Sequence, residues 1–399
     1  MYKIRLADNT IDQQELDALA DWVRGNPRLT MGELTLQLEE TIARFLGGGH
    51  VIFVNSGSSA NLLAMYGLAL TNERARRSAI VPAISWVTTV SPAIHFGYQI
   101  AICDCDRGNL GLDVGHFESL CKTVKPSIVV LVHVLGHANH LDDIQRIADK
   151  YGITIMEDSC EAFGSTYKGR ALGTFGKVGT FSFFYGHQLS TIEGGAIWTS
   201  DTELANVIRS LRAHGWARDV DAGTRSRWEL EFGIDEFQSL YTFYHPGFNC
   251  RSSDLNAYIG LSQMKKAAHV AQRRQQNFGI YSQNLKSGFW QQTSDTETLS
   301  SFAFGTLVEN RLELHQHLKA AGIESRPLVC GSIGRQPFWT RRYGAVPLPN
   351  ADIVHRYGMY LPNHIGLTRA DIEFVVHEFN RKAIPRTFSN SESLIAQSS

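Results

Sequence analysis

A histidine stands in a polar turn between two apolar stretches, where acid–base chemistry is possible. The aromatic run containing Phe181 and Phe183 ends at residues 185–191, which include His187, and a Gly-Gly pair precedes the apolar run 196–198. This alternation predicts a strand, a loop and a strand, with His187 in the loop. Because imidazole changes charge near neutral pH, His187 could accept and return a proton. An isolated histidine in apolar surroundings is otherwise more often a core residue.

Polar side chains follow two of the predicted strands. Asp158 comes two residues after the end of the buried run 153–156, and Ser58 follows the run 51–54 in a Gly-Ser-Ser turn that opens a helix. A strand–turn–helix junction of this kind directs free backbone N–H groups at one point, as phosphate binding requires. The same junction can equally be an ordinary helix cap. Trp86, after a further short strand, is either a ring-stacking side chain or a core aromatic.

Buried apolar runs alternate with helical patterns through the first part of the chain. The runs are 51–54, 78–83, 98–103, 128–134 and 153–156. Such alternation predicts a mostly parallel sheet with helices on both faces, whose ligands bind beyond the carboxyl ends of the strands.

The remaining patterns suggest how the chain divides. Residues 10–47 are expected to form two amphipathic helices, and the polar segment 219–240 is expected to be a loop. We expect a large domain over 1–268, a smaller α+β domain over 269–386, and a disordered tail rich in Ser and Asn over 387–399.

Length and composition are ordinary for a globular enzyme. The 399 residues are 43% hydrophobic and 19% charged, with a formal net charge of -1, so no basic field favours nucleic acid or anionic membranes. No apolar run reaches the roughly 18 residues of a membrane span. Residues 1–8 lack the apolar core of a signal peptide. We therefore expect a cytoplasmic protein without nucleic-acid or membrane partners.

The cysteines are scattered. The sequence has six, and Cys103 and Cys105 are the only close pair. Metal and cluster sites need several ligands at close spacing, so we expect reduced thiols and no metal site.

Taken in order, these segments resemble the DegT/DnrJ/EryC1/StrS family of sugar aminotransferases, over nearly the whole chain. The matching motifs are the turn at 57–59, Trp86, the segment 156–161 and the loop 180–195. The resemblance implies the α/β fold of the PLP-dependent transferases of fold type I, which is aspartate aminotransferase-like. It also implies pyridoxal 5'-phosphate as the cofactor, bound by the large domain.

The family's cofactor contacts carry over to matching positions of this sequence. Gly57, Ser58 and Ser59 match the phosphate-binding turn, and Ser182 matches a serine that also reaches the phosphate. Trp86 matches the aromatic residue that stacks on the pyridine ring.

Three further positions match family residues around the cofactor. Asp158 matches the acid that keeps the pyridine nitrogen protonated, the alternative being a solvated acid at a helix start. Glu161 stands where many relatives carry glutamine, and the resemblance implies a hydrogen bond to the ring hydroxyl. Asn249 resembles an asparagine with which a neighbouring subunit completes the phosphate site, which would imply a homodimer; it could equally be a turn residue.

His187 occupies the position of the family's Schiff-base lysine. That lysine is both the covalent anchor and the base that moves a proton, and imidazole can serve only as the base. The nearest lysines in sequence, Lys168 and Lys177, do not fit the position. The cofactor is therefore expected to be held noncovalently, as pyridoxamine 5'-phosphate.

One branch of the family, the sugar 3-dehydratases, carries this histidine. The chain is similar to that branch also at 211–216 and 326–329, but it departs at Gly186, at Gln188 and around 219–245. The resemblance implies removal of the C3 hydroxyl from a nucleotide-linked 4-keto-6-deoxy sugar, as in the biosynthesis of O-antigen dideoxysugars. The expected substrate is GDP-4-keto-6-deoxy-D-mannose, with L-glutamate as amino donor and release of ammonia and 2-oxoglutarate.

Three residues are candidates for substrate contacts. Arg326 could bind the glutamate carboxylate or the sugar diphosphate in bidentate fashion, or could form a structural salt bridge. His214 and Arg218, between a helix and the predicted loop, could line the sugar pocket.

Other functions remain possible from the sequence. An ordinary sugar aminotransferase would need the lysine that His187 replaces, and a non-catalytic sugar- or cofactor-binding homologue would not be expected to keep Trp86, Asp158 and Ser182. A second histidine-bearing branch carries a [2Fe-2S] cluster, which needs four thiolates. Cys250 stands alone in its region, so no iron–sulfur cluster is expected.

Overall fold

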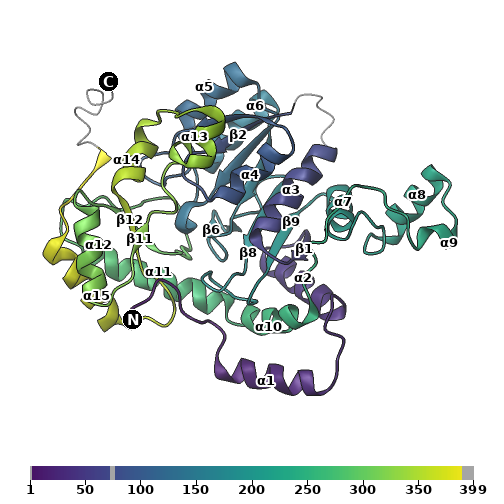
Figure 1. The fold of residues 1–399 in the computed structure, drawn as a ribbon, viewed down its shortest axis with the longest axis horizontal. Helices are drawn as coiled ribbons and strands as arrows, with labels where there is room; N and C mark the ends of the chain where they lie inside the picture. The colour runs from purple at the N-terminus through teal and green to yellow at the C-terminus, as the bar shows by residue number, and fades with distance from the viewer. Residues whose placement is uncertain (1, 72–76, 389–399) are drawn as a thin grey trace.

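The computed structural model describes residues 2–71 and 77–388, and the chain forms a large α/β body with a smaller α+β part beside it (Figure 1). Within these residues, the large sheet has seven strands in the order β1-β9-β8-β5-β4-β2-β3. The strands are β1 (His50–Val54), β2 (Ser78–Pro82), β3 (Gln99–Cys103), β4 (Ile128–Val132), β5 (Thr154–Asp158), β8 (Val178–Ser182) and β9 (Gly195–Thr199). Strands β3, β2, β4, β5 and β8 run parallel, and β9 is antiparallel to both β8 and β1. The predicted mostly parallel sheet is confirmed.

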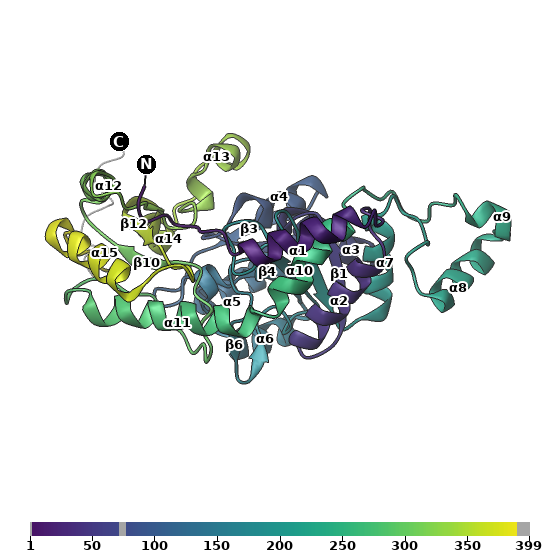
Figure 2. The same cartoon turned by 90° about the horizontal axis from the view of Figure 1, so that it is seen from below.

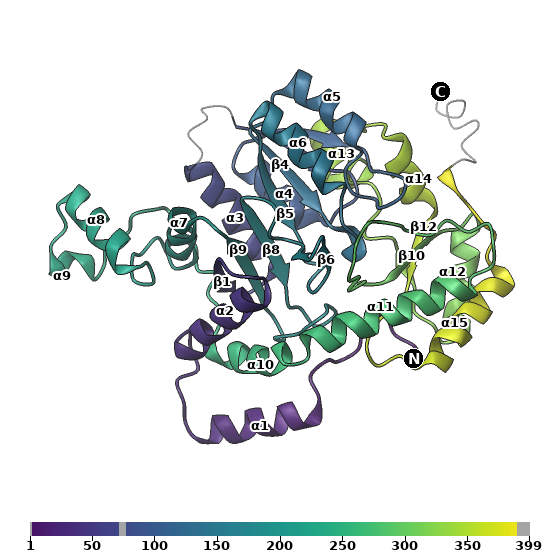
Figure 3. The same cartoon turned by 180° about the vertical axis from the view of Figure 1, so that it is seen from behind.

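Helices cover both faces of this sheet. Alternate side chains of each strand point to opposite faces, so both faces carry apolar residues that the helices bury. The helices of the large body are α1 (Gln13–Arg24), α2 (Glu33–Phe45), α3 (Gly57–Thr71), α4 (Val87–His95), α5 (Val114–Val124), α6 (Leu141–Tyr151), α7 (Thr202–Arg212) and α10 (Asp254–Met264). Val130 of β4 lies in the apolar cluster with α3 and α7, whereas its neighbours Val129 and Leu131 lie in the cluster with α5 and α6. Figure 3 shows α5 and α6 over the second face.

The smaller part packs around a three-stranded antiparallel sheet, β10-β12-β11. Its elements are α11 (Ala267–Asn284), β10 (Phe304–Leu307), α12 (Arg311–Ala320), β11 (Arg326–Pro327), α13 (Pro337–Tyr343), α14 (Pro349–Tyr357), β12 (Gly358–Leu361) and α15 (Arg369–Lys382). Helix α11 belongs to two cores: Val270 packs with β1 and β8, and Tyr281 packs with β10 and α15. This helix therefore packs in the cores of both parts and joins them.

The segment 219–240 is helical, so the predicted loop there is wrong. Helices α8 (Ala222–Phe232) and α9 (Glu236–Ser239) form an arm that extends from the body beyond α7 (Figure 2). The carboxylate of Asp221 caps the start of α8, and Gly233 ends it in a left-handed conformation. Local capping therefore makes helices in a segment whose composition alone indicates a loop.

The predicted disordered tail is described only at its start. Phe388 is buried, and its ring lies 5.6 Å from that of Trp290, measured between centroids. Residues 389–399 lie outside the described part of the chain.

Two further predictions concern the state of the cysteines and membrane-spanning segments. All six cysteines are free thiols. Among the described residues, no helix combines the length and the apolarity that a membrane crossing requires.

We predict that Gly195→Ala destabilises the protein by about 3 kcal/mol or more. A Cβ at Gly195 would lie 2.4 Å from the carbonyl carbon and oxygen of Ser56, where β9 passes the turn before α3. Backbone atoms cannot rotate away as a side chain can. Urea unfolding would measure the loss.

Gly279→Ala in α11 is the matched control, because a Cβ there meets no atom within 4 Å. Alanine favours a helix over glycine by about 1 kcal/mol, so this variant should be at least as stable as the wild type. Equal stability of the two variants would contradict the close approach of β9 to the turn.

Candidate active site

One cavity gathers most of the predicted site residues, and we call it the main cavity for that reason. It lies beyond the carboxyl ends of β4, β5 and β8, where the larger sheet meets residues of the smaller part, and its volume is about 330 Å³. Its lining includes the following predicted site residues: Gly57, Ser58, Trp86, Asp158, Glu161, Ser182, His187 and Arg326. These residues come from five separate segments, and the fold brings them together as the sequence patterns indicate.

One end of the main cavity is built to receive an anion. Helix α3 begins at Gly57, so the N–H groups of its first turn have no partner within the helix and its positive end faces the cavity. The hydroxyl of Ser58 lies 3.0 Å from that of Thr88, and a Cβ at Gly57 would lie 2.6 Å from the Cβ of Ser182. Backbone and hydroxyl donors therefore converge where the sequence predicts a phosphate.

Ser59 differs from its neighbours in this turn. Its backbone N–H donates to the Ser56 hydroxyl oxygen at 3.1 Å, and Ser56 rather than Ser59 lines the main cavity. Ser59 thus serves the cap of α3, and Ser56 is a lining residue that the sequence analysis missed.

The Asp158 carboxylate is buried at the end of β5, with 5% of the residue exposed. Its Oδ2 accepts hydrogen bonds from the Asn61 amide at 2.8 Å and from the Thr89 hydroxyl at 2.7 Å, and its Oδ1 accepts from the Cys160 N–H at 3.1 Å. No lysine, arginine or histidine of the described residues forms an ion pair with it. A carboxylate held in this way by neutral donors can still receive a cationic group from the cavity.

Trp86 stands at the start of α4 with 57% of its surface exposed, so it is not a core aromatic. Its indole lines the main cavity and offers a flat apolar face. An aromatic ring bound in the cavity could stack on it.

His187 lies in the loop between β8 and β9, as predicted. Its Nδ1 lies 2.7 Å from the carbonyl oxygen of Cys160. Because a carbonyl only accepts, this geometry assigns the proton to Nδ1 and leaves a lone pair on Nε2. The ring also packs against Phe302, with 5.1 Å between the centroids.

The surroundings of His187 favour the neutral imidazole. Burial, as the main cause, lowers the pKa of His187 to about 4; the charge of Arg274 acts in the same direction, and the Cys160 carbonyl and Asp158 oppose it. At neutral pH the side chain is therefore a base with a free Nε2.

The main cavity has no lysine among the described residues that line it. Lys168 pairs with Asp142, and Lys177 pairs with Asp201, both at exposed positions. The nearest lysines in sequence thus have partners on the surface.

Glu161 also faces the main cavity. Its Oε2 accepts a hydrogen bond of 2.8 Å from the N–H of Leu135, a buried residue in the left-handed conformation (φ 52°), which is uncommon for leucine. Burial raises the pKa of Glu161 to about 7, the Leu135 hydrogen bond lowers it, and the charge of Asp158 raises it. Glu161 can therefore carry a proton near neutral pH and donate a hydrogen bond.

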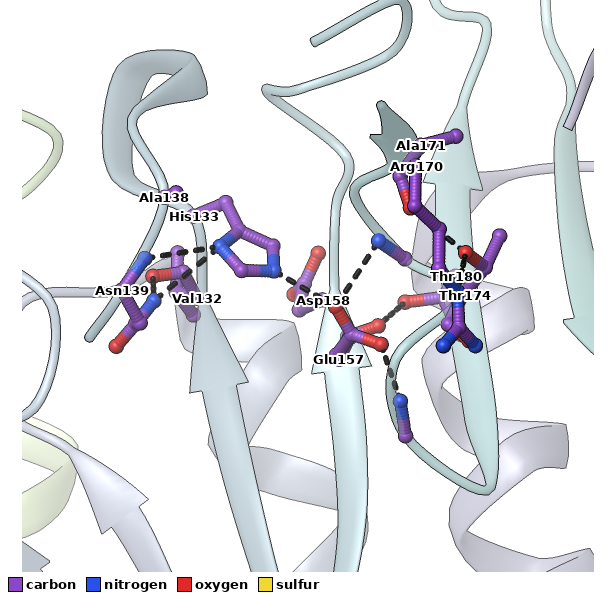
Figure 4. A network of polar contacts seen from close by, with 12 residues as sticks. Val132, His133, Ala138, Asn139, Glu157, Asp158, Arg170, Ala171, Thr174 and Thr180 are labelled. Carbon is purple, nitrogen blue, oxygen red and sulfur yellow. Dashed lines mark hydrogen bonds and ion pairs between the residues drawn. The ribbon is translucent and has the colours of Figure 1, made fainter. Parts of the chain in front are cut away.

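A buried polar network lies behind the cavity wall (Figure 4). His133, after β4, places its Nε2 2.8 Å from the Glu157 carboxylate of β5, and both side chains are fully buried. Glu157 also accepts from the N–H of Gly173 at 3.0 Å, and the Nδ1 of His133 lies 3.3 Å from the amide nitrogen of Asn139. The network fixes the ends of β4 and β5 and therefore the start of the segment that carries Asp158.

The smaller part of the protein contributes to the cavity wall through side chains without a local sequence signal. Phe302, Val329 and Tyr360 line the main cavity, together with Arg326. Arg326 also donates a hydrogen bond of 2.8 Å to Glu324, so it faces the cavity and forms a salt bridge at once. Arg326 therefore has both the position expected of a substrate-binding residue and the salt bridge expected of a structural one.

His214, Arg218 and Asn249 do not line the main cavity of their own chain. The Arg251 guanidinium donates to the Asn249 side-chain oxygen at 3.0 Å and lies 3.2 Å from the Nε2 of His214. Arg218 lines a second cavity, whose volume is about 200 Å³. Other residues of that lining are Arg28, Arg212, Trp216 and Arg251. The expectation that His214 and Arg218 line the sugar pocket is thus not met within one chain, because the end of α7 holds them beside β1, away from the carboxyl end of β5.

Comparison with known proteins agrees with this architecture. Residues 9–380 match the DegT/DnrJ/EryC1/StrS aminotransferase family. The chain is 32% identical to the GDP-4-keto-6-deoxy-D-mannose 3-dehydratase of Yersinia pseudotuberculosis, over 91% of this chain and 95% of that one. It is 34% identical to the lipopolysaccharide biosynthesis protein RfbH of Salmonella typhimurium, over 88% of this chain and 85% of that one.

Among solved structures, the chain resembles the E. coli GDP-4-keto-6-deoxy-D-mannose-3-dehydratase with bound hydrated PLP. The TM-score is 0.86 at 29% identity, over 95% of this chain and 99% of that one. The predicted fold, that of the PLP-dependent transferases of fold type I, is confirmed. The chain therefore belongs to the DegT/DnrJ/EryC1/StrS aminotransferase family.

Proposed function

We propose that this protein is a sugar 3-dehydratase that depends on pyridoxamine phosphate and removes the C3 hydroxyl of a nucleotide-linked 4-keto-6-deoxy sugar. The proposed substrate is GDP-4-keto-6-deoxy-D-mannose, L-glutamate is the amino donor, and ammonia and 2-oxoglutarate are released. One observation carries the proposal: His187 presents a free Nε2 to a cavity whose described lining has no lysine. The names of the similar proteins support the substrate class.

The donor set of the main cavity fits pyridoxal and pyridoxamine 5'-phosphate. The α3 turn, with Gly57, Ser58 and Ser182, would hold the phosphate, and Trp86 would stack on the ring. Asp158 would pair with the protonated ring nitrogen, which supplies the cation that its buried carboxylate lacks.

When bound, pyridoxamine phosphate supplies the amine that reacts with the C4 ketone and a ring that accepts electrons. His187 would take the proton from the cofactor's reactive carbon at Nε2 and, now charged, return it to the departing C3 hydroxyl. The Cys160 carbonyl stabilises the charged ring through the Nδ1–H. Since the pKa of His187 is lowered, its charged form is a stronger acid than an ordinary imidazolium, and the proton is readily released again.

Anionic parts of the substrates need a cation. Arg326 is the one lysine or arginine among the described residues that line the main cavity, so it would bind the glutamate carboxylate or the sugar diphosphate. In a homodimer, the exposed Asn249 would complete the phosphate site of the neighbouring subunit, with His214 and Arg218 near the sugar.

We also propose a cytoplasmic location and the domain division 1–268, 269–386 and 387–399.

An ordinary aminotransferase is the main competitor, and the absence of a lysine from the described cavity lining disfavours it. Borohydride reduction separates the two functions. A lysine-bound cofactor becomes permanently attached, whereas the cofactor of this protein should remain removable by dialysis.

The proposed reaction can be tested by turnover. The protein with pyridoxal phosphate, L-glutamate and GDP-4-keto-6-deoxy-D-mannose should release ammonia and a sugar that has lost one oxygen, as mass spectrometry would detect. A panel of dTDP-, UDP- and CDP-linked 4-keto sugars tests the nucleotide. Transfer of the amino group to the sugar without loss of oxygen would overturn the proposal in favour of an aminotransferase.

We predict that His187→Lys lowers the dehydration rate by about 10³-fold or more, because both proton transfers are assigned to one imidazole. The new lysine should also allow borohydride to fix the cofactor to the protein. The matched control is His95→Lys, since His95 is exposed at the end of α4 and should be silent. Unchanged dehydration in the His187 variant would remove this residue from the mechanism.

We predict that Glu161→Gln changes the pH dependence of both stability and activity. Because the pKa of Glu161 is raised to about 7 in the folded protein, folding protects its proton, and stability falls as pH rises from about 4.3 to 7. The variant should therefore gain thermal stability over the wild type as pH rises through this window.

Activity should respond in the same range, because ionised Glu161 cannot donate a hydrogen bond to the ring hydroxyl. The wild type should lose activity above about pH 7, and the Gln variant, which keeps a donor, should not. Melting curves of the cofactor-free protein and kcat profiles would measure the two effects. Parallel profiles for both proteins would show that Glu161 does not titrate there.

A further inference from the structure

Arg274, on α11, is a buried arginine without an acidic partner among the described residues. Only 2% of the residue is exposed, and its hydrogen bonds go to backbone carbonyls. Burial lowers its pKa to about 10, so it still carries its charge at neutral pH. Burying a guanidinium without a carboxylate is unfavourable, and a side chain of this kind calls for a role that an apolar residue could not fill.

The carbonyl partners of Arg274 come from three segments, two of which line the main cavity. One guanidinium nitrogen donates to the carbonyl of His187 at 3.2 Å, and the other donates to Ser301 at 3.2 Å, to Phe302 at 3.0 Å and to Asn363. Phe302 is the residue whose ring packs against the His187 imidazole. Arg274 therefore holds both His187 and the ring against which it packs.

The rest of this face of α11 shows that packing alone does not need the arginine. Asn277 and Tyr281, one and two turns further along, donate to the carbonyls of His364 at 3.0 Å and Pro362 at 2.8 Å. These neutral side chains already join α11 to the segment after β12. Arg274 is the residue on this face of α11 that donates to the His187 loop and that carries a charge.

The charges around His187 come from every side of the cavity. Asp158 ends β5 and Glu161 follows it, Glu193 lies in the His187 loop, and Arg326 and Tyr360 come from β11 and β12. Of these groups, the charge of Asp158 favours the charged imidazole. Arg274 lies directly behind the loop and opposes Asp158, and Arg326 is partly neutralised by Glu324.

We propose that Arg274 is the positioning residue of His187: it anchors the catalytic loop through the His187 carbonyl and supplies the fixed positive charge behind the imidazole. The proposal rests on the proposed function only for the role of His187 as a base. It explains why an unpaired guanidinium is buried at this place.

The test uses Arg274→Met, which keeps the approximate volume and removes the charge and the donors. The rate at which diethyl pyrocarbonate modifies the His187 peptide, measured by mass spectrometry against pH, gives the titration midpoint of this histidine, since the reagent attacks neutral imidazole. We expect the wild-type midpoint to lie well below that of the exposed His95 in the same samples, and the variant midpoint to rise by about one pH unit or more.

Arg273→Met is the matched control, because Arg273 precedes Arg274 on α11 and donates instead to the Leu367 carbonyl at 2.7 Å. It should leave the His187 midpoint unchanged. A variant of Arg274 that loses stability but keeps the wild-type midpoint would overturn the proposal, because a merely structural arginine behaves in that way.

If Arg274→Met does not fold, Arg274→Gln serves in its place, because it removes the charge but keeps hydrogen-bond donors for the carbonyls. Its His187 midpoint should also rise above that of the wild type, and an unchanged midpoint would overturn the proposal. All samples are free of cofactor and sugar, so a failed turnover assay would contradict the proposed function without affecting this result.

Discussion

The hydrogen bond between the His187 Nδ1–H and the Cys160 carbonyl, 2.7 Å long, is the contact on which the chemistry of the main cavity depends. It fixes the tautomer of the imidazole and aims Nε2 at the cavity. The carbonyl belongs to the segment 158–161 at the end of β5, which also supplies the buried acid Asp158 and the protonatable Glu161. This short segment therefore provides the buried acid Asp158, the carbonyl that orients the base His187, and the titratable Glu161.

That segment must be held more firmly than a surface loop, and buried polar groups hold it. The Glu157 carboxylate accepts from His133, which follows β4, and from the turn at Gly173, and Asp158 accepts from Asn61 and Thr89. Thr180 donates to the amide oxygen of Asn61, which turns the amide nitrogen toward Asp158. Satisfied networks of this kind fix side-chain orientation because an unpaired buried polar group is costly.

The parts of the site that sequence analysis predicts are those with a local signal. Asp158 follows a buried strand, the turn at 57–59 opens a helix, and His187 occupies a recognisable loop. Phe302, Tyr360 and Arg274 carry no such signal, because their roles arise from contacts between distant parts of the chain, such as that between Arg274 and His187, 87 positions apart. The loop expected at 219–240 is wrong for a related reason: polar composition does not exclude a helix when Asp221 and Gly233 cap it.

Replacing a tethering lysine with histidine changes what the rest of the cavity has to do. Without a covalent link, a cofactor is retained only by contacts at its ends and on its face. In the proposed function these are the α3 turn for the phosphate, Asp158 for the ring nitrogen and Trp86 for the ring. Each is itself held by contacts with the protein: the turn by β9, Asp158 by Asn61 and Thr89, and Trp86 by its place at the start of α4. The imidazole is held likewise, by the Cys160 carbonyl on one side and by Arg274 behind its loop. A noncovalent cavity of this kind can release a spent cofactor and still keep its base in place, because no contact that orients His187 passes through the cofactor.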